Sequence, residues 1–282
     1  MAIGIMAVAA ALLRLALGRW LPRSTADEGR WRPGLDGGLA LACGVITAGL
    51  ADGLLWPAHL RGDVFLTADF HEYCAGVERF RGGEINTFLH KRSYLALLPA
   101  TVLSWPLGVL GGLQAAAVLS VGVTGAALFL WGRALHGRTA GVAAALLALA
   151  FGPWVLNTRH LTSYPALGAC FALAAAAGAV AARGRTPLAL AIGGAGAGLA
   201  LLADARGLIF ALPVLALTLA AALKSPPREW PPRLAAAFAP VLVSYGLGVL
   251  CFSEGAYSLE QQVDVRPLFH RAGMRGPAYD PP

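Results

Sequence analysis

Two long stretches of the chain lack the charges that a water-facing protein needs. No charged residue occurs from Ser93 to Gly132, and no acidic residue occurs between Glu84 and Asp204. Of all 282 residues only 13% are charged and 57% are hydrophobic, whereas soluble domains carry roughly a quarter charged residues. These features exclude a soluble globular domain and predict an all-α, polytopic membrane protein.

About 20 apolar residues are needed for a helix to cross a bilayer. Seven runs of about this length are bounded by charge, Gly or Pro, although the fifth and sixth are short. We therefore expect seven transmembrane helices over approximately 35–56, 113–132, 139–156, 161–182, 187–203, 207–223 and 234–252.

Basic residues are concentrated in alternate connections between these runs. Loops 21–34, 133–138, 183–186 and 224–233 carry ten basic residues against three acidic ones. Because cytoplasmic loops are enriched in Lys and Arg, these four connections are predicted to be cytoplasmic, and the net charge of +7 is an orientation signal, not a nucleic-acid patch. The basic residues are Arg23, Arg30, Arg32, Arg133, Arg138, Arg183, Arg185, Lys224, Arg228 and Arg233.

This alternation divides the chain into three parts. Residues 1–34 form an N-terminal anchor and cytoplasmic segment, 35–252 the transmembrane module, and 253–282 an external tail. Within the module, 57–112 is a long first external loop. The first 20 residues are either an uncleaved amphipathic anchor or an additional span.

The segment 93–112 is apolar enough to cross the membrane, but counting it as a span would reverse every later loop. It also contains Pro99 and Pro106, which disrupt a straight helix. We therefore expect a bent juxtamembrane helix in the outer leaflet.

The external loop contains a helical pattern over residues 67–83, with apolar residues at helical spacing and Gly82-Gly83 as a stop. This helix is expected to lie on the membrane surface with its apolar face down. Asp69 and Glu72 fall at its start. The same Asp-x-x-Glu arrangement also suits a helix cap with no catalytic role.

Together these features resemble the membrane-embedded glycosyltransferases of the GT-C type, in particular the protein O-mannosyltransferase and aminoarabinose transferase group. The resemblance covers most of the chain and consists of layout and short motifs. Its elements are the acidic motif Asp69-Phe-His-Glu72-Tyr73, the Pro-containing helix 93–112, the basic hairpin 132–138, Phe-Gly-Pro at 151–153 followed by Arg159, and a seven-helix core.

The resemblance implies transfer of a sugar from a polyprenyl-phosphate donor to an acceptor outside the cytoplasm, with inversion, in a bacterial inner membrane. Asp69 is then the candidate general base, with Glu72 beside it. The candidate ligands of the lipid phosphate are Arg159, His160, Arg206, Lys91 and Arg92.

No cofactor is expected, although oxygen and imidazole side chains of the loop could hold a divalent ion. No pair among them has a recognised ligand spacing. These side chains are His59, Asp63, Asp69, His71, Glu72 and His90. The four cysteines show no metal-ligand spacing and predict neither a disulfide framework nor structural zinc.

Other functions are open from the sequence. Ser163-Tyr164 stands where relatives often carry a second acidic residue, and this favours a noncatalytic GT-C-like subunit that binds a partner protein through the external loop. A lipid-linked sugar transporter is a further alternative, but the spans contain few of the charges that line substrate pathways. The last alternative is a membrane protein with several spans and no catalytic activity.

Small residues dominate one predicted span. The run Gly-Gly-Ala-Gly-Ala-Gly at 193–198 places small residues on several faces of one helix. Such a helix allows neighbouring backbones to approach closely. Drift toward Ala and Gly in a GC-rich coding sequence explains the run equally well.

Overall fold

The computed structural model describes residues 31–60, 68–84, 94–150, 161, 164–184, 187–203, 207–223 and 226–251. Every regular element in these ranges is a helix, which confirms the all-α prediction for this part of the chain. The elements are α3 (Pro33–Leu60), α4 (Ala68–Arg81), α5 (Tyr94–His136), α6 (Arg138–Ala150), α8 (Tyr164–Gly184), α9 (Pro187–Ala203), α10 (Gly207–Leu223), the short 3₁₀ helix η1 (Pro227–Glu229) and α11 (Trp230–Cys251).

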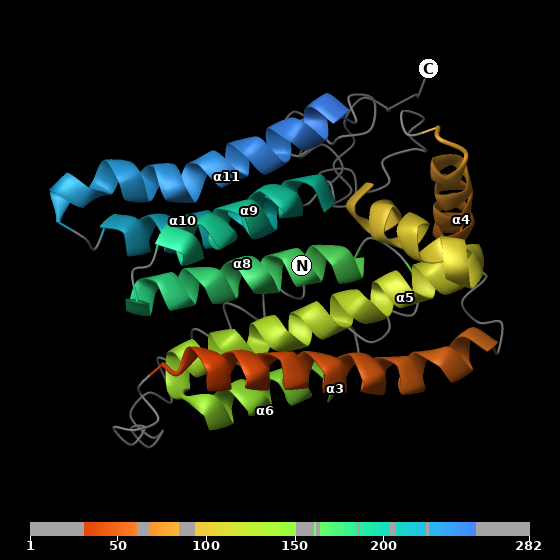
Figure 1. Ribbon diagram of the computed structural model, residues 1–282, viewed down its shortest axis with the longest axis horizontal. Coiled ribbons are helices and arrows are strands. Elements are labelled where there is room, and N and C mark those ends of the chain that lie inside the picture. The colour runs from red at the N-terminus through yellow and green to blue at the C-terminus, as the bar shows by residue number, and fades with distance from the viewer. Residues whose placement is uncertain are drawn as a thin grey trace, which may run out of the picture.

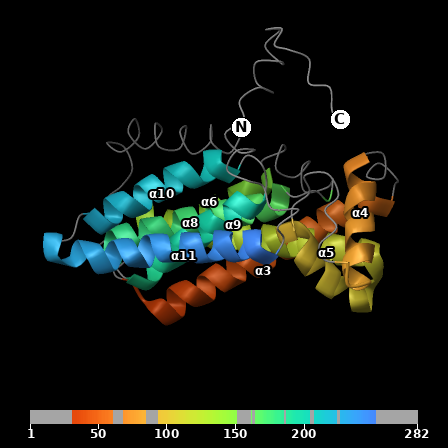
Figure 2. The ribbon, with the colours of Figure 1, turned by 90° about the horizontal axis from the view of Figure 1, so that it is seen from above.

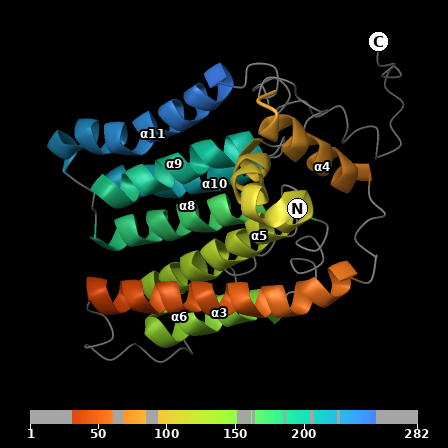
Figure 3. The same cartoon turned by 45° about the vertical axis from the view of Figure 1, so that its right-hand side comes forward.

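The long helices lie side by side in one elongated bundle (Figures 1 and 3). α5 packs against α3, α6 and α8, and α9 packs between α8 and α11 with α10 against α8 and α9. In contrast, α4 runs across one end of the bundle in both perpendicular views (Figures 1 and 2).

Each of the seven predicted spans overlaps a helix of the described residues, although residues 151–156 of the third predicted span lie outside them. Within the described ranges, three segments are long and apolar enough to cross a membrane, namely Pro33–Asp52, Leu97–His136 and Tyr164–Ala181. Two shorter apolar helices in these ranges cover Arg138–Ala148 and Pro187–Leu202. These lengths and compositions fit a membrane-embedded protein. Helix bounds differ from the predicted ones at several ends, since α3 continues to Leu60 and α11 begins at Trp230.

The helix ends that border the four basic connections lie together at one end of the bundle (Figures 1 and 3). Near these ends of α8, α9, α10 and α11, one buried cluster contains Ala181, Ala189, Ala222 and Ala237. The start of α3 and the turn between α5 and α6 lie at the same end. The basic connections were predicted to share one side of the membrane, and the helix ends that border them do lie at one end of the bundle.

The predicted bend of the segment 93–112 occurs within α5 at Gly108, two residues after Pro106. Gly108 has φ 73° and ψ 170°, a conformation that is accessible to glycine and strained for other residues. The break divides α5 into a first arm, residues 94–107, and a second arm, residues 109–136. The first arm rises only about 20 Å at 1.5 Å per residue, which is less than the roughly 30 Å hydrocarbon core of a bilayer.

The first arm folds back onto the second. A Cβ atom at Gly112 would lie 2.5 Å from the carbonyl oxygen of Ala100 and 2.7 Å from the backbone nitrogen of Ser104. Only glycine at 112 permits this contact between the two arms. The bend is therefore fixed by close backbone packing as well as by Pro106.

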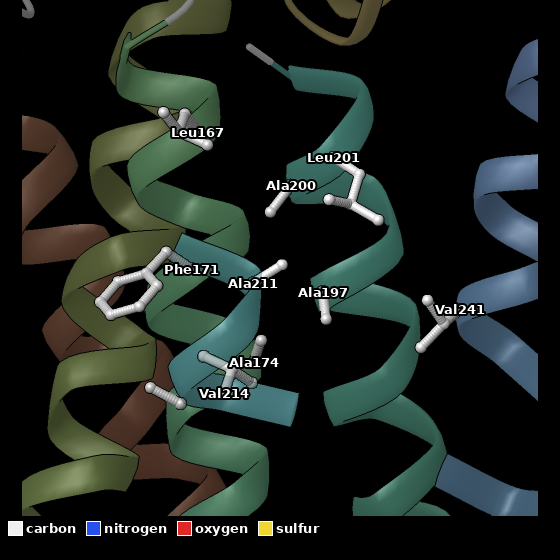
Figure 4. Close-up of a cluster of buried hydrophobic side chains, with 10 residues drawn as sticks. Leu167, Phe171, Ala174, Ala197, Ala200, Leu201, Ala211, Val214 and Val241 are labelled. Atoms are coloured by element: carbon white, nitrogen blue, oxygen red, sulfur yellow. The ribbon is translucent and has the colours of Figure 1, made fainter. Parts of the chain in front are cut away.

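The small residues of α9 pack closely against two neighbouring helices, an approach that the run 193–198 allows. A Cβ at Gly194 would overlap the carbonyl oxygen of Ala237 in α11, and one at Gly196 would lie 2.9 Å from the Cβ of Ala174 in α8. α9 thus has close neighbours on two sides. The adjoining core, shown in Figure 4, is formed by Leu167, Phe171, Ala174, Ala175, Ala197, Ala200, Leu201, Ala211, Val214 and Val241.

Large apolar side chains cover the outer surface of the bundle. Leu41 on α3, Leu147 on α6, Leu188 on α9 and Leu242 on α11 are each at least two thirds exposed. The exposed large hydrophobic side chains occur on α3, α5, α6, α9, α10 and α11, which is unusual for a water-soluble monomer. A surrounding lipid phase accounts for it.

The close α9–α11 packing predicts the effect of adding one methyl group. Gly194→Ala should lower the free energy of unfolding by about 1–3 kcal/mol through overpacking, although alanine itself favours a helix. Gly246→Ala in α11 is the matched control, because no atom lies within 4 Å of its added Cβ. Thermal unfolding in detergent measures both, and equal stability of the two variants would contradict the packing argument.

The predicted orientation can be tested at two exposed positions. In a background without the four cysteines, Glu78→Cys in α4 should react with a membrane-impermeant maleimide on intact cells, and Arg228→Cys in η1 should react only after permeabilisation. The expectation follows from the basic loops being cytoplasmic. Labelling of position 228 but not 78 on intact cells would reverse the topology.

Candidate functional site

α4 is anchored to the bundle by its apolar face. Its buried side chains contact both arms of α5. A Cβ atom added at Gly76 would lie 3.0 Å from the side chain of Leu97 in the first arm, so the glycine leaves room for this leucine. We refer to this packing as the α4 cluster, which consists of Tyr73, Val77, Phe80, Leu97, Ala100, Leu113, Ala117 and Leu161.

The α4 cluster corrects the expected position of this helix. Helix formation near residues 67–83 is confirmed, but the apolar face does not lie on the membrane. Tyr73, Val77 and Phe80 are buried against protein instead. The bent α5 supplies an apolar partner, so α4 excludes water by packing on its own chain.

Asp69 and Glu72 are the second and fifth residues of α4. Both therefore lie at the start of this helix, as predicted. Glu72 is half-buried, whereas the side chain of Asp69 lies outside what the structure describes.

The five predicted ligands of the lipid phosphate lie outside the described residues. They are Lys91, Arg92, Arg159, His160 and Arg206. Leu161, which directly follows two of them in the sequence, is described and belongs to the α4 cluster. It has φ 49°, the left-handed region that is uncommon for residues other than glycine.

Cys74 on α4 has a free thiol that is partly buried against the α4 cluster. Burial, together with the negative charge of Glu78, raises the pKa of this thiol to about 11. The thiol is therefore protonated at neutral pH and is not a thiolate nucleophile. Among the described residues, no three His, Cys, Asp or Glu side chains come together as a metal site.

A polar cluster lies at the end of the bundle opposite to α4, and the sequence did not predict it. The carboxylate of Asp36 near the start of α3 is fully buried and accepts hydrogen bonds from Arg133 Nε at 3.1 Å and Arg138 Nε at 2.7 Å. It also accepts a bond from the backbone N–H of Arg32 at 2.8 Å. Asp36, Arg133 and Arg138 form what we call the charge cluster, and it joins the ends of α3, α5 and α6.

From the sequence, Arg133 and Arg138 were interpreted as orientation signals and as part of the basic hairpin 132–138. The available indication of a pairing was Asp36, an acidic residue inside an apolar segment that adjoins an Arg-rich loop. Gly137, with φ 101°, separates α5 from α6 so that the two arginines lie on successive helices. Arg133 also stacks over the ring of Trp31, at 5.5 Å from the ring centroid.

Comparison with protein-family models, with curated proteins and with solved structures finds no match for the chain. The GT-C resemblance therefore rests on the motifs and layout of the sequence.

The charge cluster predicts a large cost for removing its carboxylate. Asp36→Asn should lower the free energy of unfolding by about 3–5 kcal/mol, because two arginines lose their buried counter-ion. Asp52→Asn is the matched control, since Asp52 lies exposed on the same helix. Unfolding in detergent provides the measurement, and similar losses in both variants would show that the charge cluster does not stabilise the fold.

Proposed function

We propose that this protein transfers a sugar from a polyprenyl-phosphate donor to an acceptor hydroxyl on the external face of the membrane. A GT-C-like core of seven spans carries the reaction, with α4 as part of the first external loop. The observation that carries the proposal is the α4 cluster. It holds the helix with the acidic motif across one end of the bundle, and it includes Leu161, the residue that follows Arg159 and His160 in the sequence.

The position of Asp69 within α4 supports its role as the base. Residue 69 is the second residue of α4, three positions before Glu72. Residue 69 also lies in the first turn of α4, where the positive end of the helix dipole favours a carboxylate.

The reaction requires a base for the proton of the acceptor hydroxyl and positive charge for the departing lipid phosphate. The acceptor oxygen attacks the anomeric carbon from the face opposite the phosphate, and Asp69 accepts the proton of the hydroxyl as the new C–O bond forms. The bond between the anomeric carbon and the phosphate oxygen breaks, and its electron pair leaves with the polyprenyl phosphate. Arg159 is the proposed ligand of that phosphate because a guanidinium can bind two of its oxygens. His160, Arg206, Lys91 and Arg92 are the proposed additional ligands.

The proposal predicts different effects for three carboxylates of α4. Asp69→Asn keeps the shape of the side chain but removes the base, so transfer from a polyprenyl-phosphate sugar should fall by at least about 100-fold. Glu72→Gln should cost less if Glu72 only supports the start of the helix. Glu78→Gln, on the exposed side of α4, should leave transfer unchanged.

These rates are measured with purified protein in nanodiscs, together with the unfolding temperature of each variant. An Asp69→Asn variant that is as stable and as active as the wild type would remove Asp69 from the mechanism. Wild-type protein that is inactive with every lipid-linked donor would instead favour the noncatalytic subunit.

A further inference from the structure

One buried polar side chain of the bundle lacks a partner in the described part of the chain. Seven polar or charged side chains are buried there, and six of them form hydrogen bonds with described residues. The six are Asp36, Thr47, Thr101, Ser104, Thr124 and Arg133. The seventh, Gln114, is 4% exposed, and its amide makes no hydrogen bond with any described residue.

The four paired hydroxyls show how polar groups are normally satisfied in these helices. Thr101 Oγ1 donates to the carbonyl of Leu97 and Thr124 Oγ1 to that of Ser120, each at 2.8 Å. The long side chain of Gln114 does not bond to its own helix in this way. A buried amide without a partner is destabilising, so native proteins nearly always supply one, either a protein group, water or a ligand.

Gln114 lies beside the candidate site. It is in the second arm of α5, six residues after the break at Gly108. Its neighbours Leu113 and Ala117 both belong to the α4 cluster. Positions 114 and 117 are one helical turn apart, so Gln114 is at the edge of the surface on which α4 packs.

We propose that Gln114 binds the sugar of the polyprenyl-phosphate donor, an inference that rests on the proposed function. A carboxamide has one accepting oxygen and two N–H donors, and it carries no charge. Adjacent sugar hydroxyls both donate and accept, so they can satisfy the amide oxygen and nitrogen together. A phosphate group only accepts, and it is better matched by arginine.

Gln114→Met tests this assignment because methionine has nearly the same length and volume but no amide. The probes are undecaprenyl phosphate and its glucose-, mannose- and aminoarabinose-bearing forms, titrated onto protein in nanodiscs. Wild-type protein should bind one sugar-bearing form more tightly than the sugarless phosphate. Gln114→Met should weaken that form by about tenfold, the usual value of one to two hydrogen bonds, and leave the sugarless phosphate unchanged.

Thr124→Val is the matched control. Thr124 is a buried polar residue of the same arm, but its hydroxyl is already bonded within the helix. This variant should keep the preference for the sugar-bearing lipid. If Gln114→Met does not fold, Gln114→Leu replaces it, and the unfolding temperature without lipid is compared with that of the wild type.

The outcomes separate the two proposals. Wild-type protein that prefers a sugar-bearing lipid equally with and without Gln114 would overturn the role of Gln114 while leaving the proposed function intact. If Gln114→Met is less stable than the wild type without lipid but binds the lipids equally well, the role of Gln114 in sugar binding is also overturned. The amide would then bind a structural water. Wild-type protein that binds none of the lipids would overturn the proposed function and with it the role of Gln114.

Discussion

The helices of this chain pack through glycine and alanine, and the other features of the fold depend on that close approach. Lipid is as apolar as leucine, so burial of large side chains contributes little to association between helices in a membrane, and van der Waals contact between backbones contributes more. Gly44 of α3 contacts Gly122 of α5, Gly132 of α5 contacts Gly141 of α6, and Gly194 of α9 contacts Ala237 of α11. Large side chains are correspondingly frequent on the outer surface.

The same principle shapes the end of the bundle that carries the candidate site. Gly112 allows the first arm of α5 to fold back on the second, and the two arms then provide an apolar surface for α4. Without the break at Gly108, α5 would continue as one helix and α4 would have no such partner. The acidic motif is therefore positioned by a bend some 40 residues later in the chain.

The two ends of the bundle use polar groups differently. At one end the charge cluster is closed, because the carboxylate of Asp36 accepts bonds from two guanidiniums and a backbone N–H. At the other end lie Gln114, whose amide has no partner among the described residues, and Leu161 in a strained conformation. Strained backbone and unsatisfied polar groups tend to occur at functional sites, whereas satisfied clusters usually maintain structure.

Much of the helical layout could be predicted from the sequence by itself. Charge-free stretches of about 20 residues identify the helices of a membrane protein because every backbone polar group in lipid must be bonded internally. The spacing of Tyr73, Val77 and Phe80 likewise predicted α4, and Pro106 indicated a bend nearby. These signals are local, and each depends on residues within a few turns of one another.

Contacts between distant segments could not be predicted in this way. The sequence placed the apolar face of α4 on the membrane, because hydrophobicity indicates that a face avoids water but not whether lipid or protein covers it. It also did not specify which distant residues pair with Asp36, about 100 positions later in the chain, or that Gln114 is buried. The helices and their order were determined by the sequence alone, whereas the partner of each polar group was decided by the tertiary structure, because only the packed bundle sets which side chains come within bonding distance.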